Sequence, residues 1–121
     1  MFLKKTISSM FVLGILALGF FNMSSAFGMA EPVDIIEKDA KYQSEDITVH
    51  IGQTIRLINK DPFLHQSQIR KVNEHGIEYP VVVGVIEPEG VTVEVSLEEV
   101  GPYKLRCRVH DGMVLNIQVV Q

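Results

Sequence analysis

The only cysteine of the chain lies in a short stretch that also holds a histidine and a methionine. Cys107, His110 and Met113 follow one another three residues apart in the segment LRCRVHDGMV. A thiolate, an imidazole and a thioether are all donors that transition metals accept. A lone cysteine can also be buried and inert, or it can bridge to another molecule. The spacing therefore predicts a metal site as one of three hypotheses.

The donor types indicate which metal such a site would take. Zinc sites prefer several cysteines and histidines, and methionine is a poor zinc ligand. Calcium and magnesium take oxygen ligands. Copper accepts one cysteine and two histidines in a trigonal plane, with a long axial methionine, in blue-copper electron-transfer sites. A copper site in this chain therefore requires a second histidine from outside the segment.

Three other histidines are candidates for this position. His50 falls in an alternating stretch, where a solvent-exposed side chain is the simplest interpretation, and His75 lies in the polar turn NEHG. His65 follows a strand-like stretch and a proline-containing loop, and its preceding neighbours Phe63 and Leu64 are apolar. Periodicity alone leaves open whether His65 is a ligand.

The chain begins with the order of residues found in a secretory signal. Lys4 and Lys5 precede an apolar run over residues 10–21, and the small residues of SSAFGMA follow. This order predicts a signal peptide over residues 1–30, with cleavage after Ala26 or Ala30, and a mature domain over residues 31–121. The apolar run is shorter than the roughly 20 residues of a membrane span, so we expect a periplasmic protein without stable membrane insertion.

The charge of the mature domain limits its partners. Without Lys4 and Lys5, nine basic residues face fifteen acidic ones, a net charge of −6. This balance argues against nucleic acid as a partner, because nucleic-acid binding relies on basic groups that neutralise phosphates. It is compatible with a protein whose encounters are steered by charge.

The pattern along residues 31–121 predicts an all-β domain. Short alternating or β-branched stretches are separated by turn residues, with no long helical period. Such a pattern is typical of a β-sandwich or a small barrel. One helical turn is expected over residues 96–101, where Ser96 and Glu99 have capping-box spacing. The predicted strands cover residues 47–51, 54–60, 79–86, 91–97, 103–109 and 113–120.

Two of these strands bear on the site. Alternation over residues 103–109 directs Tyr103, Leu105, Cys107 and Val109 into the core, and the chain then turns at once into the next strand. This return brings His110 and Met113 near the sulfur. The stretch over residues 79–86 is apolar on both faces, which favours a central position in a sheet.

Two segments together resemble the cupredoxins, the small blue copper proteins, in particular the amicyanin and plastocyanin branch. The first is VHIGQTIRLINKDPFLH, in which Asn59 precedes His65 by six residues, and the second is GPYKLRCRVHDGM with its short Cys-x2-His-x2-Met spacing. The matches extend over residues 47–119. The resemblance implies a Greek-key β-sandwich of about seven or eight strands over residues 31–121, with one type 1 copper ion.

The resemblance also implies roles for individual residues. The copper ligands would be His65, Cys107, His110 and, axially, Met113. The Asn59 side chain would tie its strand to the backbone just after Cys107, and the Gln66 N–H would donate a hydrogen bond to the sulfur. His110 would pass the electron at the surface, and Tyr103 would be structural.

Several positions near the predicted site depart from the family pattern. Val109 stands where a proline is frequent, Asp111 and Gly112 replace a proline and a phenylalanine, and Leu115 replaces a glycine. None of these differences removes a ligand. Arg108 and Asp111 make the rim around His110 more charged than is usual, so the usual partner is not implied.

The expected function is single-electron transfer through a Cu(II)/Cu(I) site, without enzymatic chemistry. Expected partners are a redox donor and an acceptor, such as a dehydrogenase or a c-type cytochrome, and we expect a monomer. The main alternative is a periplasmic copper carrier or buffer. A metal-free interaction module and a copper enzyme with an open site are less compatible with a complete ligand set.

Overall fold

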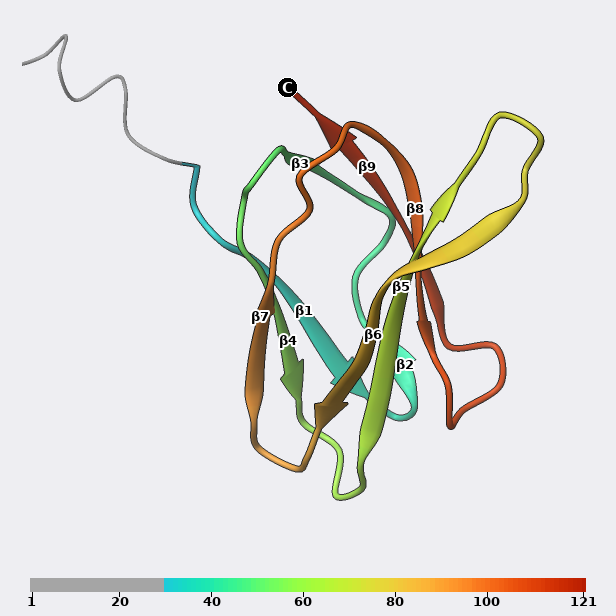
Figure 1. The fold of residues 1–121 in the computed structure, drawn as a ribbon. Helices are drawn as coiled ribbons and strands as arrows, with labels where there is room; N and C mark the ends of the chain where they lie inside the picture. The colour runs from blue at the N-terminus through green and yellow to red at the C-terminus, as the bar shows by residue number, and fades with distance from the viewer. Residues whose placement is uncertain (1–29) are drawn as a thin grey trace, which may run out of the picture.

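The computed structural model describes residues 30–121, so the predicted signal peptide lies outside the described residues apart from Ala30. Nine strands form two sheets that pack face to face (Figure 1). The described part of the chain contains no helix, and hence none that could cross a bilayer. The strands are β1 Val33–Lys38, β2 Lys41–Tyr42, β3 Ile47–His50, β4 Ile55–Asn59, β5 His65–Val72, β6 Glu78–Glu87, β7 Thr92–Val95, β8 Gly101–Cys107 and β9 Val114–Val120.

The two sheets differ in size and mix both strand directions. One has the order β2-β1-β4-β7 and the other the order β3-β9-β8-β5-β6. The β1–β4 and β3–β9 pairs are parallel, and all other pairs are antiparallel. The predicted all-β sandwich is confirmed. It has nine strands instead of seven or eight, partly because β2 consists of two residues.

The core lies between the sheets and follows the predicted alternation. Every second residue of β4, β8 and β9 is buried, because successive side chains of a strand point to opposite faces. Cys107 is the last buried residue of β8. Val109, which was predicted to face inward, is 48% exposed because it lies outside the strands. The buried apolar residues of these three strands are Ile55, Leu57, Tyr103, Leu105, Cys107, Leu115, Ile117 and Val119.

Three predictions about individual elements are wrong or incomplete. Residues 96–100 form no helical turn, and Ser96 Oγ donates to the Glu98 carboxylate instead of capping a helix with Glu99. β6 lies at the edge of its sheet and not in the centre. The predicted strands also omit β1, β2 and β5. β2 has only two residues, and the polar residues of β1 and β5 conceal their alternation of buried positions.

One end of the sandwich collects the residues that matter for the site. β5 begins at His65, β8 ends at Cys107, and β9 begins immediately after Met113. Because β5 and β8 are adjacent and antiparallel, the start of one and the end of the other meet at the same edge of the sandwich, at the lower end of Figure 1.

Candidate metal centre

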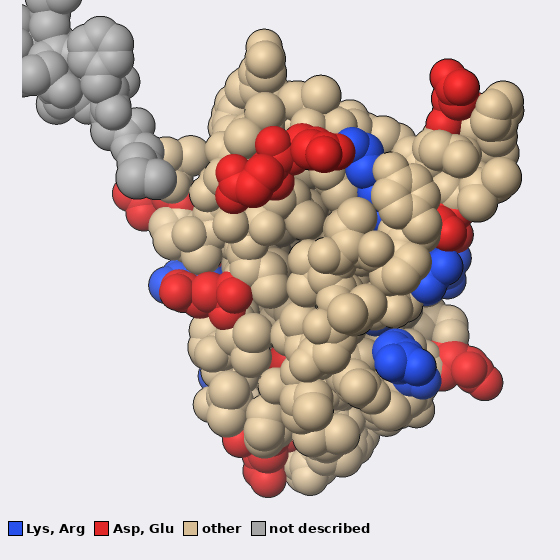
Figure 2. Space-filling model, in the orientation of Figure 1, with Lys and Arg blue, Asp and Glu red and all other residues tan. Residues whose placement is uncertain are grey.

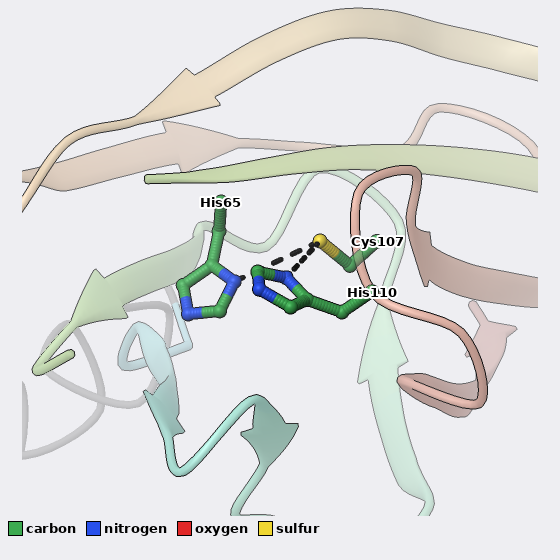
Figure 3. A group of neighbouring side chains, drawn as sticks. All are labelled: His65, Cys107 and His110. Carbon is green, nitrogen blue, oxygen red and sulfur yellow. Dashed lines mark hydrogen bonds between the residues drawn. The ribbon is translucent and has the colours of Figure 1, made fainter. Parts of the chain in front are cut away.

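His65, Cys107 and His110 converge at this end of the sandwich. The Cys107 sulfur lies 3.7 Å from His65 Nδ1 and 3.5 Å from His110 Nδ1. One donor atom from each of the three side chains lies within 4.8 Å of the others, and Figure 3 shows the rings turned toward the sulfur. The structure therefore brings together three of the four predicted ligands as a set of donors around one point.

The spacing of these donors fits a single metal ion. Bonds of ~2.3 Å to sulfur and ~2.0 Å to nitrogen, at 120° to each other, separate the two donors by about 3.7 Å. The observed sulfur-to-nitrogen distances of 3.5 and 3.7 Å agree with this value. One thiolate and two imidazoles in a plane are a donor set that copper accepts.

Strand pairing fixes the positions of Cys107 and His65. Cys107 lies opposite Ser67 in the β5–β8 pair, and His65 is two residues before Ser67 on the same inward face of β5. The Arg108 N–H donates to the Gln66 carbonyl at 2.8 Å, which extends the pairing past the cysteine. Both ligands therefore come from rigid strand ends and not from free loops.

The loop over residues 108–113 is closed by its own backbone. The Cys107 N–H donates to the Met113 carbonyl at 3.1 Å, and the Met113 N–H lies 3.4 Å from the His110 carbonyl. Gly112 has a φ of +79°, a conformation that side chains other than glycine rarely adopt. This tight return places His110 beside the sulfur, as the sequence predicts.

Met113, the fourth predicted ligand, is the last residue of this loop and is buried. Its side chain is 2% exposed, in the same apolar core as Cys107. A buried thioether is the kind of donor that serves as a weak axial copper ligand. The backbone of Met113 contacts Cys107 through the bond to its carbonyl, and its role as an axial ligand stays a prediction.

Asp61 holds the ring of His65 from the side away from the sulfur. His65 Nε2 lies 2.8 Å from Asp61 Oδ2, and the two side chains are 0% and 2% exposed. An Nε2–H that donates to the carboxylate leaves the Nδ1 lone pair facing the sulfur. Metal-binding histidines usually donate their other N–H in this way, which fixes both tautomer and ring orientation.

The same carboxylate also fixes a strained turn. Asp39 and Ala40, between β1 and β2, both have a φ of 56°, and their N–H groups donate to the two oxygens of Asp61 at 2.7 and 3.0 Å. Burial acts to raise the pKa of Asp61, but the Ala40 N–H, the His65 ring and the Asp39 N–H outweigh it and hold the pKa below its usual value. Asp61 is therefore ionised and fully hydrogen-bonded.

Phe63 covers the two histidines at the surface. Its ring centroid lies 5.3 Å from that of His65 and 5.1 Å from that of His110, and the side chain is 38% exposed. Its carbonyl accepts a hydrogen bond of 2.8 Å from the Asn59 side chain. The sequence alone indicates no role for Phe63 beyond that of an apolar neighbour of His65.

Two implied hydrogen bonds near the sulfur differ in the structure. The Asn59 side-chain amide donates to the carbonyls of Phe63 and Glu87 at 2.8 Å each, and its oxygen accepts from the Asp61 N–H. Asn59 therefore stabilises the loop before His65. It does not bind the backbone after Cys107, as the resemblance implied. Gln66 contributes its carbonyl to the Arg108 N–H. Among the described residues no hydrogen bond joins the Gln66 N–H to the sulfur.

A buried acidic pair behind the site was not predicted. Glu37 and Glu87 are 0% exposed, and the Oε1 atom of each has no hydrogen-bond partner. Ser67 links them, since its hydroxyl donates to Glu37 and its N–H to Glu87, and the Tyr42 hydroxyl lies 2.8 Å from Ser67 Oγ. Burial, together with the hydrogen bond and negative charge of Glu87, raises the pKa of Glu37 to about 9.

Most of the other residues considered in the sequence lie as predicted, with the exception of Val109. His50 is the last residue of β3, and His75 lies in the turn between β5 and β6. Both side chains are exposed and lie away from Cys107. Tyr103 is buried and donates to the Glu99 carbonyl at 2.7 Å, which is a structural role. Arg108, Val109 and Asp111 are exposed around the partly buried His110, so the rim is mixed in charge and polarity.

Solved structures of amicyanins have a similar architecture. The amicyanin from Paracoccus versutus matches with a TM-score of 0.60 at 20% identity, over 78% of this chain and 87% of that one. An amicyanin variant in its Cu(I) form and another in its oxidised state match with the same TM-score and identity, over 78% of this chain and 88% of each of theirs. The chain has the cupredoxin fold. No protein-family model matches the sequence, and no curated protein is similar to it.

Proposed function

We propose that the protein binds one copper ion through His65, Cys107, His110 and Met113 and carries single electrons. The observation that carries the proposal is the convergence of one thiol and two imidazole nitrogens, with sulfur-to-nitrogen distances of 3.5 and 3.7 Å. Bound copper supplies a one-electron couple between Cu(II) and Cu(I). The likeness to amicyanin structures in both redox states supports this choice of metal and role.

The residues around the ligands favour electron transfer over chemistry on a substrate. His65 and Cys107 are fixed by paired strands, and Asp61 fixes the His65 ring, so the donors keep their positions when the charge of the site changes. His110 is partly exposed, and Phe63 contacts its ring at the surface. The His110 ring lies 3.5 Å from the sulfur and therefore offers a route for the electron to the surface.

All four proposed ligands come from one chain, so a monomer suffices for this function. We propose an exported, periplasmic protein that meets a redox donor and an acceptor in brief encounters, as is usual for small redox proteins. Arg108 and Asp111 at the rim would contribute to the choice of partner through charge.

A copper carrier or buffer is the alternative function. It uses the same ligands but releases the metal, whereas an electron carrier retains it. The proposal is tested by repeated reduction and reoxidation of the copper-loaded protein in the presence of a Cu(I) chelator. We expect full recovery of the Cu(II) signal over many cycles, and transfer of the copper to the chelator on first reduction would favour the carrier.

A further inference from the structure

The turn between β1 and β2 is the one place in the described part of the chain where residues other than glycine have a positive φ. Asp39 and Ala40, both at a φ of 56°, are the only residues between the paired Lys38 and Lys41. Two positive φ values in a two-residue hairpin turn are those of type I′, in which Asn or Asp is normally followed by glycine. Ala40 stands where glycine is preferred, so other contacts must keep this strained turn closed.

Those contacts come from the Asp61 carboxylate. Its Oδ1 accepts a hydrogen bond of 2.7 Å from the Asp39 N–H, and its Oδ2 accepts one of 3.0 Å from the Ala40 N–H. The same Oδ2 lies 2.8 Å from His65 Nε2. One carboxylate therefore connects a turn of the four-stranded sheet to a proposed copper ligand at the start of β5, in the five-stranded sheet.

The Asp61 carboxylate depends on these donors because water hardly reaches it. Figure 2 shows acidic side chains at the surface, where water hydrates them, whereas Asp61 is 2% exposed. Among the described residues, the donors to its side chain are the two N–H groups of the turn and the His65 ring. A buried charge that loses its partners is strongly destabilised. Opening of the turn therefore moves the carboxylate toward water and away from His65.

The His65 ring in turn has few other contacts that fix it. Its Nδ1 lies 3.7 Å from the Cys107 sulfur, and thiols are weak hydrogen-bonding groups. Phe63 meets the ring edge-on, with the centroids 5.3 Å apart, and is itself 38% exposed. The bond to Asp61 is thus the strong polar contact that sets the orientation of His65.

We propose that Asp39 and Ala40 are positioning residues for the copper site. Closure of their turn holds Asp61, and Asp61 keeps His65 Nδ1 directed at the sulfur. This inference rests on the proposed function, since it gives the orientation of His65 a use in copper binding. The connection itself lies in the metal-free chain and can be tested there.

Substitutions at Asp39 test the proposal, because its side chain is exposed and its N–H makes the contact. Asparagine tolerates a positive φ, whereas a β-branched valine does not. Both replacements remove the same charge, so Asp39→Asn is the matched control for Asp39→Val. Gly76→Val is a second control, since it places valine at a φ of +78° in the β5–β6 turn, where an added Cβ meets no atom.

Exchange of the His65 Nε2 proton with solvent, followed by NMR in the metal-free protein, is the first measurement. We expect it to be about tenfold faster in Asp39→Val than in Asp39→Asn, as for one residue forced into the left-handed region. The wild type, Asp39→Asn and Gly76→Val should be alike. Equal rates in Asp39→Val and Asp39→Asn would overturn the proposal. So would equally fast exchange in Gly76→Val, because a general loss of stability would then release the ring.

Ala40→Gly tests the same connection with a variant that relieves strain and hence keeps the fold. The turn should open less often, so the His65 Nε2 proton should exchange more slowly than in the wild type. An unchanged rate in Ala40→Gly would count against the proposal.

Copper affinity, measured by competition with a chelator, is the second measurement. Asp39→Val should bind Cu(II) about tenfold more weakly than Asp39→Asn. In the Asp61→Asn background the connection is already broken, so the same pair of substitutions should then differ little. An undiminished difference in that background would overturn the proposal. A wild type without a blue band would refute the copper function alone, since proton exchange still tests the connection to His65.

Discussion

The buried Glu37–Glu87 pair makes the stability of the fold depend on pH in a way that can be measured. The pKa of Glu37 is about 9 in the folded chain against 4.5 for an ordinary glutamate, first because of burial and then because of the hydrogen bond and charge of Glu87. A raised carboxyl pKa means that the folded state holds a proton which the unfolded state releases. The stabilisation of the folded state by this proton is complete below pH 4.5 and is lost as the pH rises toward 9.

The magnitude follows from linkage. Between the two pKa values the free energy of unfolding falls by about 1.4 kcal/mol per pH unit for one proton. From pH 5.5 to pH 7.5 the wild-type protein should therefore lose about 3 kcal/mol, a large part of the 5–15 kcal/mol typical of a domain. The groups with lowered pKa values, such as Asp61, are already ionised in this window and add no slope.

Urea unfolding of the metal-free protein at several pH values measures this slope, and two variants isolate its cause. Glu37→Gln keeps the shape of the side chain and can donate a hydrogen bond to Glu87, but it does not titrate. The free energy of unfolding of this variant should therefore fall less steeply with pH than that of the wild type, by about 1.4 kcal/mol per pH unit. Glu89→Gln, at an exposed turn, should keep the wild-type slope. The same pH dependence of the free energy of unfolding in wild type and Glu37→Gln would refute the raised pKa of Glu37.

Three further changes test the parts of the site separately. Asp61→Asn should lower the free energy of unfolding by about 2–3 kcal/mol, since a buried charged hydrogen bond is lost. It should also weaken copper binding roughly 10- to 100-fold in a chelator competition, because the His65 ring is no longer held. An unchanged copper affinity would contradict this role. Met113→Leu should cost less than about 1.5 kcal/mol of stability but shift the reduction potential measured by voltammetry, and an unshifted potential would exclude an axial thioether. Tyr103→Phe should cost about 1 kcal/mol through its bond to the Glu99 carbonyl and leave the copper spectrum intact; a changed spectrum would show that its role is not only structural.

The sequence predicted the parts of the fold whose side chains alternate strictly. β4, β8 and β9 each bury one apolar face, so period and burial coincide. The inward direction of Cys107 and the return of His110 follow from that alternation and from the short loop. His65 could not be assigned by periodicity, because β5 buries His65 and Ser67, polar residues that carry no hydrophobic signal.

Other features depend on contacts between distant segments. β6 was expected in the centre of a sheet because both of its faces are apolar, yet one edge and much of one face remain open. Asn59 lies six residues before His65 as in the family, but it binds the carbonyls of Phe63 and Glu87. Glu37 and Glu87 are fifty residues apart in sequence, and nothing in either neighbourhood indicates that they meet.

The visible spectrum of the protein with one equivalent of Cu(II) tests the proposed centre most directly. The arrangement of Cys107 between His65 and His110 predicts a strong blue thiolate-to-copper band that saturates at one copper per chain. The band should be lost in Cys107→Ser and kept in His50→Ala, whose histidine is exposed away from the site. A colourless copper complex of the wild type, or a band that survives in Cys107→Ser, would contradict the account.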